Sequence, residues 1–346
     1  MCTGIQVTSL EGNTYWGRTQ EFGFPMPMDG ITIPRGYEVK GLLLSDVTFK
    51  YASMGCTLSG KDYNIDNVVM LMDGINEKGL VGGTFYFGSG YHNYATQEEV
   101  EALGKQPFRG EEFVTWAIAN CADVDELRER ALSEVAICDT ENELGAAQPQ
   151  HYWFTDKTGK SIVIEPDVKG SFTIHDNKIG TMANAPDFDY HVKNLNNYVG
   201  LTGDTQADWE MDNVTIPSSG IGSGLFGLPG DFTPQTRFVR ATIFNRMSDS
   251  PSDDMAIHRV YNILNNFDIP YGLIKTGNAL GNPDDLFVHR NQYSTAYDLN
   301  NLTLYVSPFE NRRIQSLTLK DAIENTEAIR YEIKKIQDIQ EMSPIK

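Results

Sequence analysis

The chain of 346 residues lacks any apolar run that reaches the roughly 18 residues needed to cross a bilayer as a helix. Its N-terminus also lacks the basic and apolar segments of a secretory signal peptide. With 31 glycines and 15 prolines it is neither collagen-like nor disordered in composition. Its 28 basic residues against 47 acidic ones give a net charge of −19, which argues against nucleic-acid binding through a basic surface. We expect a globular protein with no membrane or nucleic-acid partner.

Cysteine and histidine are scarce, with four and six residues respectively. Neither a C-x-x-C pair nor an H-x-x-x-H arrangement occurs, so the common zinc motifs are missing. No G-x-G-x-x-G loop follows a strand pattern, and a nucleotide cofactor is not indicated. We expect no metal, no cofactor and a reducing cytoplasm as the compartment. The cysteines beyond position 2 and the histidines, among them His92 and His151, are expected to be structural.

Apolar patterning divides the chain into blocks of strands and helices. Alternating runs predict strands at 3–8, 14–19, 68–72, 79–87, 151–155, 161–165, 171–175, 178–183, 292–298, 302–307 and 314–319. Helical spacing predicts helices at 110–121, 123–134, 187–197, 236–247 and 254–266. A helix is also predicted from about residue 321 into the charged tail, 326–346. The glycine-rich stretch 200–230 is predicted to be a long loop. This order lacks regular βαβ alternation and favours a single α+β layered domain over residues 1–346.

Cys2 directly follows the initiator methionine, which we expect to be removed. The new N-terminus then carries a thiol and an α-amine of ordinary pKa about 7.7–8.0, which can accept the thiol proton near neutrality. Taken by its position alone, a buried small apolar cysteine is the more frequent interpretation. A turn at Gly12 and Asn13, however, predicts a hairpin that returns Arg18 to Cys2, where a guanidinium favours the thiolate. A solvated strand arginine is the alternative for Arg18.

Further motifs accompany Cys2 in chain order. They are Met1-Cys2-Thr3-Gly4, Gly12-Asn13, Tyr15, Gly17-Arg18, Asn76-Glu77-Lys78-Gly79-Leu80, Asn184-Ala185-Pro186, Gly227-Leu228-Pro229-Gly230-Asp231 and Arg237-Phe238. Together they resemble the choloylglycine hydrolase family, which contains conjugated bile acid hydrolases and penicillin V acylases. The resemblance covers nearly the whole chain. It implies an N-terminal nucleophile hydrolase, built as a four-layer αββα sandwich of antiparallel sheets, that cleaves linear carbon–nitrogen amide bonds.

The resemblance also implies roles for individual residues. Cys2 would be the nucleophile, with its own amine as the proton shuttle and Arg18 beside the thiolate. Asn184 matches the asparagine whose side-chain amide donates to the oxyanion, and a backbone N–H near Tyr86 would be the second donor. Arg237 matches the second active-site arginine. Amide cleavage needs such donors, because losing one typically costs about 10²–10³ in rate.

Glu21 departs from the family pattern. It stands where the family usually has an aspartate that helps to hold the α-amine, so one extra methylene must be accommodated. The carboxylate is retained, which favours an active enzyme. The alternative from another functional class is a catalytically silent acyl-amide binding protein, in which Glu21 has spoiled the alignment of the amine.

Tyr86 bears on the substrate. It occupies a position at which bile acid hydrolases usually have asparagine and penicillin V acylases commonly have tyrosine. An aromatic and thioether set would suit a flat or flexible apolar acyl group, although core packing is the alternative for each member: Phe22, Phe24, Met26 and Phe87. We predict a penicillin V acylase-like amidohydrolase. The alternatives are a conjugated bile acid hydrolase and, after it, a hydrolase of N-acyl homoserine lactones or other N-acyl amides.

The stretch 200–224 resembles the segment with which members of this family reach a neighbouring subunit. That resemblance implies a homotetramer, whereas a surface loop is the alternative. The substrate expected throughout is a small-molecule N-acyl amide.

Overall fold

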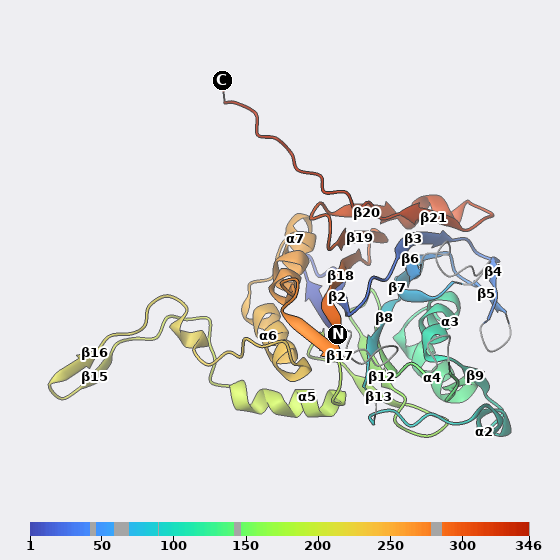
Figure 1. The fold of residues 1–346 in the computed structure, drawn as a ribbon, viewed down its shortest axis with the longest axis horizontal. Helices are drawn as coiled ribbons and strands as arrows, with labels where there is room; N and C mark the ends of the chain where they lie inside the picture. Colours follow the sequence, from blue (N-terminus) through green and yellow to red (C-terminus); the bar gives the residue numbers. More distant parts are fainter. Residues whose placement is uncertain (42–45, 59–68, 89, 142–146, 278–285, 346) are drawn as a thin grey trace.

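The computed structural model describes residues 1–41, 46–58, 69–88, 90–141, 147–277 and 286–345, and two antiparallel sheets dominate them (Figure 1). The first sheet has the order β14 (Thr181–Met182), β1 (Cys2–Thr8), β2 (Thr14–Phe22), β18 (Leu286–Asp298), β19 (Thr303–Pro308) and β20 (Gln315–Thr318), with β17 (Ile274–Gly277) paired to β18. The second has the order β13 (Thr173–Asp176), β12 (Ser161–Glu165), β11 (Gln150–Thr155), β8 (Val81–Tyr86), β7 (Leu71–Asn76), β6 (Ser53–Leu58), β3 (Met28–Ile33) and β21 (Ile329–Glu332).

Helices and short strand pairs complete the described part of the chain. The helices are α2 (Gln97–Ala102), α3 (Phe113–Asn120), α4 (Val124–Glu134), α5 (Phe188–Asn194), α6 (Pro234–Met247) and α7 (Asp253–Leu264). The 3₁₀ turns are η1 (Gly110–Glu112), η2 (Leu195–Tyr198), η3 (Ser223–Leu225), η4 (Asn265–Phe267) and η5 (Leu319–Ile323). The strand pairs are β4 (Glu38–Val39) with β5 (Val47–Thr48), β9 (Gln106–Phe108) with β10 (Val135–Ile137), and β15 (Trp209–Met211) with β16 (Val214–Ile216).

Apolar clusters separate four layers. Successive side chains of a strand point to opposite faces of its sheet, and buried apolar side chains lie on both faces of each sheet. Between the sheets, Trp16 of β2 packs on Trp153 of β11 with ring centroids 5.2 Å apart. On the outer faces, α6 and α7 cover β1 and β2, while α3 and α4 cover the second sheet (Figure 1). These layers confirm the predicted αββα sandwich.

The first strand, β1, lies between β14 and β2 in the first sheet. The β1–β2 hairpin pairs Cys2 with Gln20 and Gly4 with Arg18. Gly4 is required at its position, since a Cβ atom there would lie 2.5 Å from the Trp153 ring of the facing sheet. The first residues of the chain are therefore held tightly between the two sheets.

The C-terminal tail contradicts the helix predicted for 326–346. Residues 329–332 form β21 instead, which pairs antiparallel with β3 so that Ile329 lies opposite Thr32 and Tyr331 opposite Gly30. No helix or strand follows in the described residues 333–345. The charge pattern of the tail was misleading because β3, about 300 residues earlier in the chain, offers a free strand edge. Backbone hydrogen bonds to that edge outweigh the local helix propensity.

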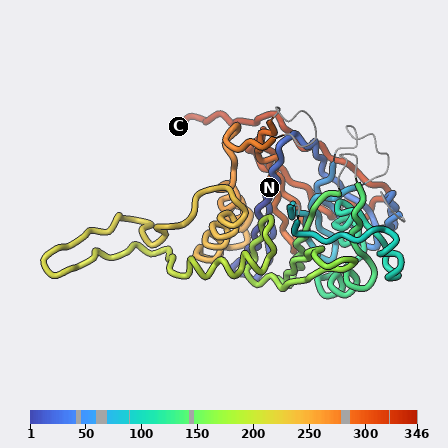
Figure 2. Tube along the Cα trace, turned by 60° about the horizontal axis from the view of Figure 1, so that its bottom comes forward, coloured from blue at the N-terminus to red at the C-terminus, as the bar shows by residue number. Residues whose placement is uncertain are grey.

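Two other predicted segments differ in detail. The strand predicted at 68–72 runs from Leu71 to Asn76, and Val68 lies outside the described residues. The stretch 200–230 is not loop throughout, since it contains the β15–β16 hairpin and η3. That hairpin projects from the body of the molecule in both ribbon and tube views (Figures 1 and 2). None of the helices in the described part of the chain combines the length and apolarity needed to span a bilayer.

Candidate active site

Arg18 meets Cys2 between the two sheets. Its Nη2 lies 2.8 Å from Cys2 Sγ and also donates to Gln20 Oε1, while Nη1 donates to the Met72 carbonyl at 3.2 Å. The guanidinium is fully buried and lies 4.6 Å above the Phe85 ring. The structure thus brings together the thiol and the guanidinium that the hairpin was predicted to join, with the cation fixed by contacts to β1, β2 and β7.

Asp73 is the counter-charge of Arg18, and sequence reasoning missed it. Its carboxylate lies 3.8 Å from Arg18 Nη1 and accepts hydrogen bonds from Tyr293 at 2.8 Å and Tyr297 at 2.6 Å. Burial raises the pKa of Asp73 and outweighs the lowering by Arg18 and the two hydroxyls. Burial also opposes the charge of Arg18, but Cys2, Tyr293 and Asp73 outweigh it and raise the arginine pKa. The strand predicted at 68–72 ends just before Asp73, whereas the structure places this residue inside β7.

Asn184 joins three elements around Cys2. Its Oδ1 accepts the peptide N–H of Cys2 and an N–H of Arg237 Nη2, each at 2.7 Å, and its Nδ2 donates to the Tyr86 carbonyl at 2.8 Å. These partners settle the orientation of the amide, since donors face the oxygen and an acceptor faces the nitrogen. Arg237 Nη1 also donates to the Cys2 carbonyl and to Thr3 Oγ1. The structure therefore brings together Cys2, Asn184, Arg237 and the Tyr86 backbone.

Glu21 lies against the chain terminus. The Met1 ammonium donates to the Glu21 carbonyl at 2.8 Å, and the Glu21 N–H donates back to the Met1 carbonyl at 2.9 Å. The Glu21 carboxylate is buried, and neither of its oxygens has a hydrogen-bond partner among the described residues. Burial raises the pKa of Glu21 more than the terminal ammonium and Arg237 lower it. Removal of Met1 would convert the Cys2 nitrogen, now a peptide N–H, into an amine beside Asn184 and near this carboxylate.

The aromatic residues predicted for the substrate pocket do not form one group. Phe22 and Phe24 are half-buried and meet edge to face at 4.6 Å, and the Tyr86 side chain is 45 % exposed. We call these three residues the rim. Met26 is buried in the apolar cluster against which Phe22 and Phe24 pack. Phe87 does not join them, because it is fully buried and stacks on His151 at 4.3 Å.

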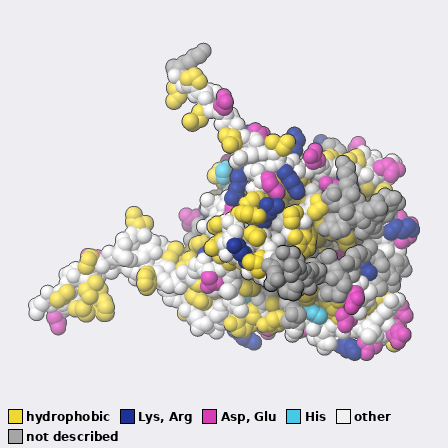
Figure 3. Space-filling model, in the orientation of Figure 1, with side chains coloured by type: hydrophobic (Ala, Val, Ile, Leu, Met, Phe, Trp, Pro, Cys, Tyr) yellow, Lys and Arg dark blue, Asp and Glu magenta, His cyan; other side chains and the backbone are white. Residues whose placement is uncertain are grey.

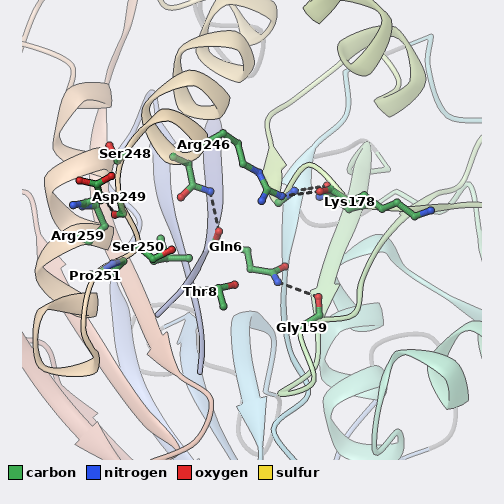
Figure 4. A pocket seen from close by; sticks show the side chains of 14 residues that line it. Gln6, Thr8, Gly159, Lys178, Arg246, Ser248, Asp249, Ser250, Pro251 and Arg259 are labelled. Atoms are coloured by element: carbon green, nitrogen blue, oxygen red, sulfur yellow. Dashed lines mark hydrogen bonds between the residues drawn. The ribbon is translucent and has the colours of Figure 1, made fainter. Parts of the chain in front are cut away.

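Figure 4 shows a polar cavity of about 240 Å³ with its lining residues. Gln6 and Thr8 of β1 line it together with Arg246 and Arg259. Arg246 is already engaged, since it donates to the carbonyls of Lys178 and Ile179 at 2.7 and 2.9 Å. None of the predicted site residues lines this cavity. Among the residues that the structure describes, no group of three or more His, Cys, Asp or Glu side chains is placed to hold a metal ion.

A cysteine at position 2, on the inner first strand of a four-layer αββα sandwich, defines the class of N-terminal nucleophile hydrolases. The model of the choloylglycine hydrolase family of linear amide C–N hydrolases matches residues 2–331. The chain therefore belongs to that family, and it is an amide hydrolase by family.

Named relatives extend over nearly the full length. The bile salt hydrolase/transferase of Clostridium perfringens is 31 % identical over 98 % of this chain and 99 % of its own, and the conjugated bile acid hydrolase of Lactobacillus gasseri is 28 % identical over 90 % and 93 %. The structure of the C2A mutant of the C. perfringens conjugated bile acid hydrolase superposes with a TM-score of 0.86 at 29 % identity, over 99 % of this chain and 100 % of that one.

The penicillin V acylase of Agrobacterium tumefaciens superposes with a TM-score of 0.69 at 18 % identity, over 96 % of this chain and 91 % of that one. This likeness shows the shared fold alone. The comparisons thus support the predicted amidohydrolase, and among its substrates they favour the alternative, bile acid conjugates, over the penicillin V acylase-like activity predicted from Tyr86.

Proposed function

We propose that this chain hydrolyses bile acids conjugated to glycine or taurine. The observation that carries the proposal is the arrangement of Cys2, Arg18, Asn184 and Arg237 in a chain that resembles bile salt hydrolases over its whole length. The acyl group would be the apolar steroid with its side-chain carbonyl, and the leaving group would be glycine or taurine. Such a substrate combines an apolar body with an amide at its end, which suits the partly exposed aromatic side chains of the rim and a buried polar centre.

The mechanism begins after loss of Met1. The Cys2 amine takes the thiol proton, and Arg18 Nη2, 2.8 Å from the sulfur, stabilises the thiolate. The sulfur attacks the amide carbon, so a C–S bond forms while the carbonyl becomes an oxyanion. Asn184 Nδ2 carries two hydrogens, and the Tyr86 carbonyl holds one of them. We assign the second, with a backbone N–H near Tyr86, to the oxyanion.

Collapse of the tetrahedral intermediate breaks the C–N bond. The protonated Cys2 amine gives its proton to the departing nitrogen, which leaves as free glycine or taurine, and a thioester remains on Cys2. The same amine then removes a proton from water, whose oxygen attacks the thioester. The bile acid is released and the thiol is restored. Arg237 bonds the Cys2 carbonyl and Asn184 Oδ1, which keeps nucleophile and oxyanion donor in a fixed relation.

Penicillin V remains a second candidate substrate, because the exposed Tyr86 ring supports it. The test is a side-by-side assay of glycine conjugates, taurine conjugates and penicillin V, with protein whose N-terminal Cys2 is verified by mass. We expect the bile conjugates to have the higher kcat/KM. A preference for penicillin V would contradict the proposal and make Tyr86 the marker of specificity. N-acyl homoserine lactones are the third class to include in the assay.

The silent acyl-amide binding protein is tested at Glu21. The Glu21→Asp substitution should change the turnover of an active enzyme little, because a carboxylate is present in both. A large gain from near-zero turnover in the wild-type chain would show instead that Glu21 blocks catalysis.

We also propose a homotetramer that works in the cytoplasm. The β15–β16 hairpin supports the assembly, since it projects from the body and carries exposed apolar side chains (Figure 3): Trp209, Met211, Val214 and Ile216. All four cysteines are unpaired, which supports a reducing compartment. Light scattering should give the mass of four chains for the wild type and a smaller mass for a Trp209→Asp, Ile216→Asp double variant. A monomeric wild type would make the hairpin a surface loop.

A further inference from the structure

A buried carboxylate lies behind the loop that carries Asn184. Glu165, on β12, is 1 % exposed, and its Oε1 accepts the Phe188 N–H at 2.9 Å at the start of α5. The same oxygen lies 3.3 Å from His151 Nδ1, and Oε2 lies 3.2 Å from His175 Nε2. Burial by itself raises the pKa of Glu165, but hydrogen bonds from the two imidazoles lower it to about 2. The group is therefore a carboxylate at neutral pH.

His151 carries the contact from Glu165 to the other end of the loop. Its Nε2 lies 3.1 Å from the Ala183 carbonyl, immediately before Asn184. Both ring nitrogens face acceptors, a carboxylate on one side and a carbonyl on the other. The ring therefore links Glu165 to the Ala183 carbonyl through its two nitrogens. His151 was expected to be structural, with no partner assigned. The structure places it beside Glu165 on the neighbouring strand β12 and beside the Ala183 carbonyl, which follows β14.

His191 holds the next carbonyl of the loop. Its Nε2 lies 2.7 Å from the Asn184 carbonyl, while its Nδ1 has no partner among the described residues. Burial lowers the pKa of His191 to about 4, so the ring is neutral and its hydrogen lies on Nε2. The ring also stacks on Phe238 of α6 at 4.8 Å. Two imidazoles thus bind two consecutive carbonyls, one on each side of the Asn184 side chain.

We propose that Glu165, acting through His151, is a positioning residue that fixes Asn184 as the oxyanion donor. The inference rests on the proposed function, because it concerns the donor of that reaction. One carboxylate oxygen binds both ends of the loop 183–188, directly at Phe188 and through His151 at Ala183. Neither Glu165 nor His151 is hydrogen-bonded to Cys2 or Arg18. The Cys2 nitrogen is linked to the loop through Asn184 Oδ1, whereas the Cys2 sulfur lies against Arg18 Nη2 and Gln20 Oε1. A donor misplaced by about 1 Å can cost on the order of 10² in rate.

Other charged groups near the carboxylate are His175 on β13, Asp189 on α5, and Asp167 between β12 and β13. His175 Nδ1 lies 3.4 Å from Asp189 on α5, so His175 bridges two carboxylates and binds no atom of the loop carbonyls. Hydrogen bonding to Glu165, opposed by burial, raises the pKa of His175. His175 thereby helps to balance the charge of Glu165, while the geometric link to Asn184 passes through His151.

The test is the Glu165→Gln substitution, assayed on the best bile conjugate. We expect kcat to fall at least tenfold with KM changed less than twofold, because the loss affects the oxyanion and not substrate binding. Alkylation of Cys2 by iodoacetamide, read on the N-terminal peptide by mass spectrometry, should keep the wild-type rate, since the sulfur is held by Arg18 and Gln20 and by no atom of the loop. The proposal would be overturned by an unchanged kcat, or by an alkylation rate that falls by the same factor as kcat.

Tyr152→Phe is the matched control. Tyr152 neighbours His151 on β11, is equally buried, and donates to the Gly110 carbonyl at 2.9 Å on the opposite face of the sheet. This variant should lose stability without losing more than twofold in kcat. If Tyr152→Phe lowers Tm as much as Glu165→Gln and lowers kcat equally, the effect is general destabilisation and the proposal fails.

A second pair keeps the test decisive if Glu165→Gln does not fold. His151→Gln retains an N–H donor for the Ala183 carbonyl, whereas His151→Phe does not, so we expect the Gln variant to keep at least fivefold more kcat. Equal activity of the two would overturn the proposal. If the wild type hydrolyses none of the substrates, the proposed function fails. The positioning role is then read from hydrogen exchange at 183–188, which should be faster in Glu165→Gln and unchanged in Tyr152→Phe.

Discussion

The proposed reaction centre of Cys2, Arg18, Asn184 and Arg237 is buried, whereas the rim of Phe22, Phe24 and Tyr86 is partly exposed. Each polar side chain of the centre is hydrogen-bonded to residues from other parts of the chain. The Asn184 side chain, for example, binds residues of β1, β8 and α6. In the rim, Phe22 and Phe24 contact aromatic neighbours through their rings, such as Phe24 with Phe287 at 5.5 Å.

This difference separates chemistry from specificity. A change in the centre leaves buried donors or charges without partners, which is costly, whereas a change at the rim alters shape with little penalty. Sequences can therefore diverge at the rim while the reaction is kept. The same reasoning explains why a single tyrosine predicted penicillin V, although the bulk of the chain resembles bile acid hydrolases.

The largest effect should follow from Cys2→Ser. An alcohol is a much weaker nucleophile than a thiolate at neutral pH, so we expect kcat to fall by at least about 10³-fold. The measurement is hydrolysis by protein whose N-terminus is verified by mass, so that retained Met1 cannot mimic the loss. A chain extended before position 2, with the thiol present and the amine blocked, should be equally inactive. Near-normal turnover by Cys2→Ser would remove Cys2 from the mechanism.

Asn184→Ala should cost about 10²–10³ in kcat, the usual loss of one oxyanion donor. Asn184→Asp is the informative companion, because it keeps an acceptor for Cys2 and Arg237 but has no N–H to donate. If the donor role is correct, both variants lose comparable kcat. If Asp restores most of the activity, Asn184 serves as an anchor for Arg237 and the oxyanion is stabilised elsewhere.

The two regions also differ in how far the sequence predicts them. The meeting of Cys2 and Arg18 follows from one local hairpin, so the turn at Gly12 was sufficient to predict it. Asn184 accepts a hydrogen bond from Cys2, 182 residues away in the chain, and no local sequence pattern indicates that contact. Only the family resemblance predicted that Asn184 belongs to the site. Asp73 and Glu165 escaped because a carboxylate in an apolar strand acquires meaning only when its partners are known. The tail failed for the same reason, since the partner of β21 is β3 near the opposite end of the chain.

Asp73→Asn should distinguish the two regions by stability. Removing this carboxylate leaves the buried Arg18 cation without its counter-charge and leaves two tyrosine hydroxyls facing an amide. We expect the free energy of unfolding to fall by about 3 kcal/mol, measured by denaturant titration. Phe24→Leu at the rim should cost less than about 1.5 kcal/mol. Equal losses at the two positions would show that the rim is as constrained as the centre.

The smallest effect should come from Tyr86→Asn, and it concerns preference and not rate. The Tyr86 carbonyl binds Asn184 through the backbone, so the substitution leaves the oxyanion donor in place and changes only an exposed ring. We expect the ratio of kcat/KM for bile conjugates over penicillin V to rise by about tenfold, within the range of one altered apolar contact. Tyr86→Phe keeps the ring and should keep the wild-type ratio. A large loss of kcat on every substrate would mean that the Tyr86 side chain belongs to the centre, and the division between fixed chemistry and variable rim would have to be redrawn at that residue.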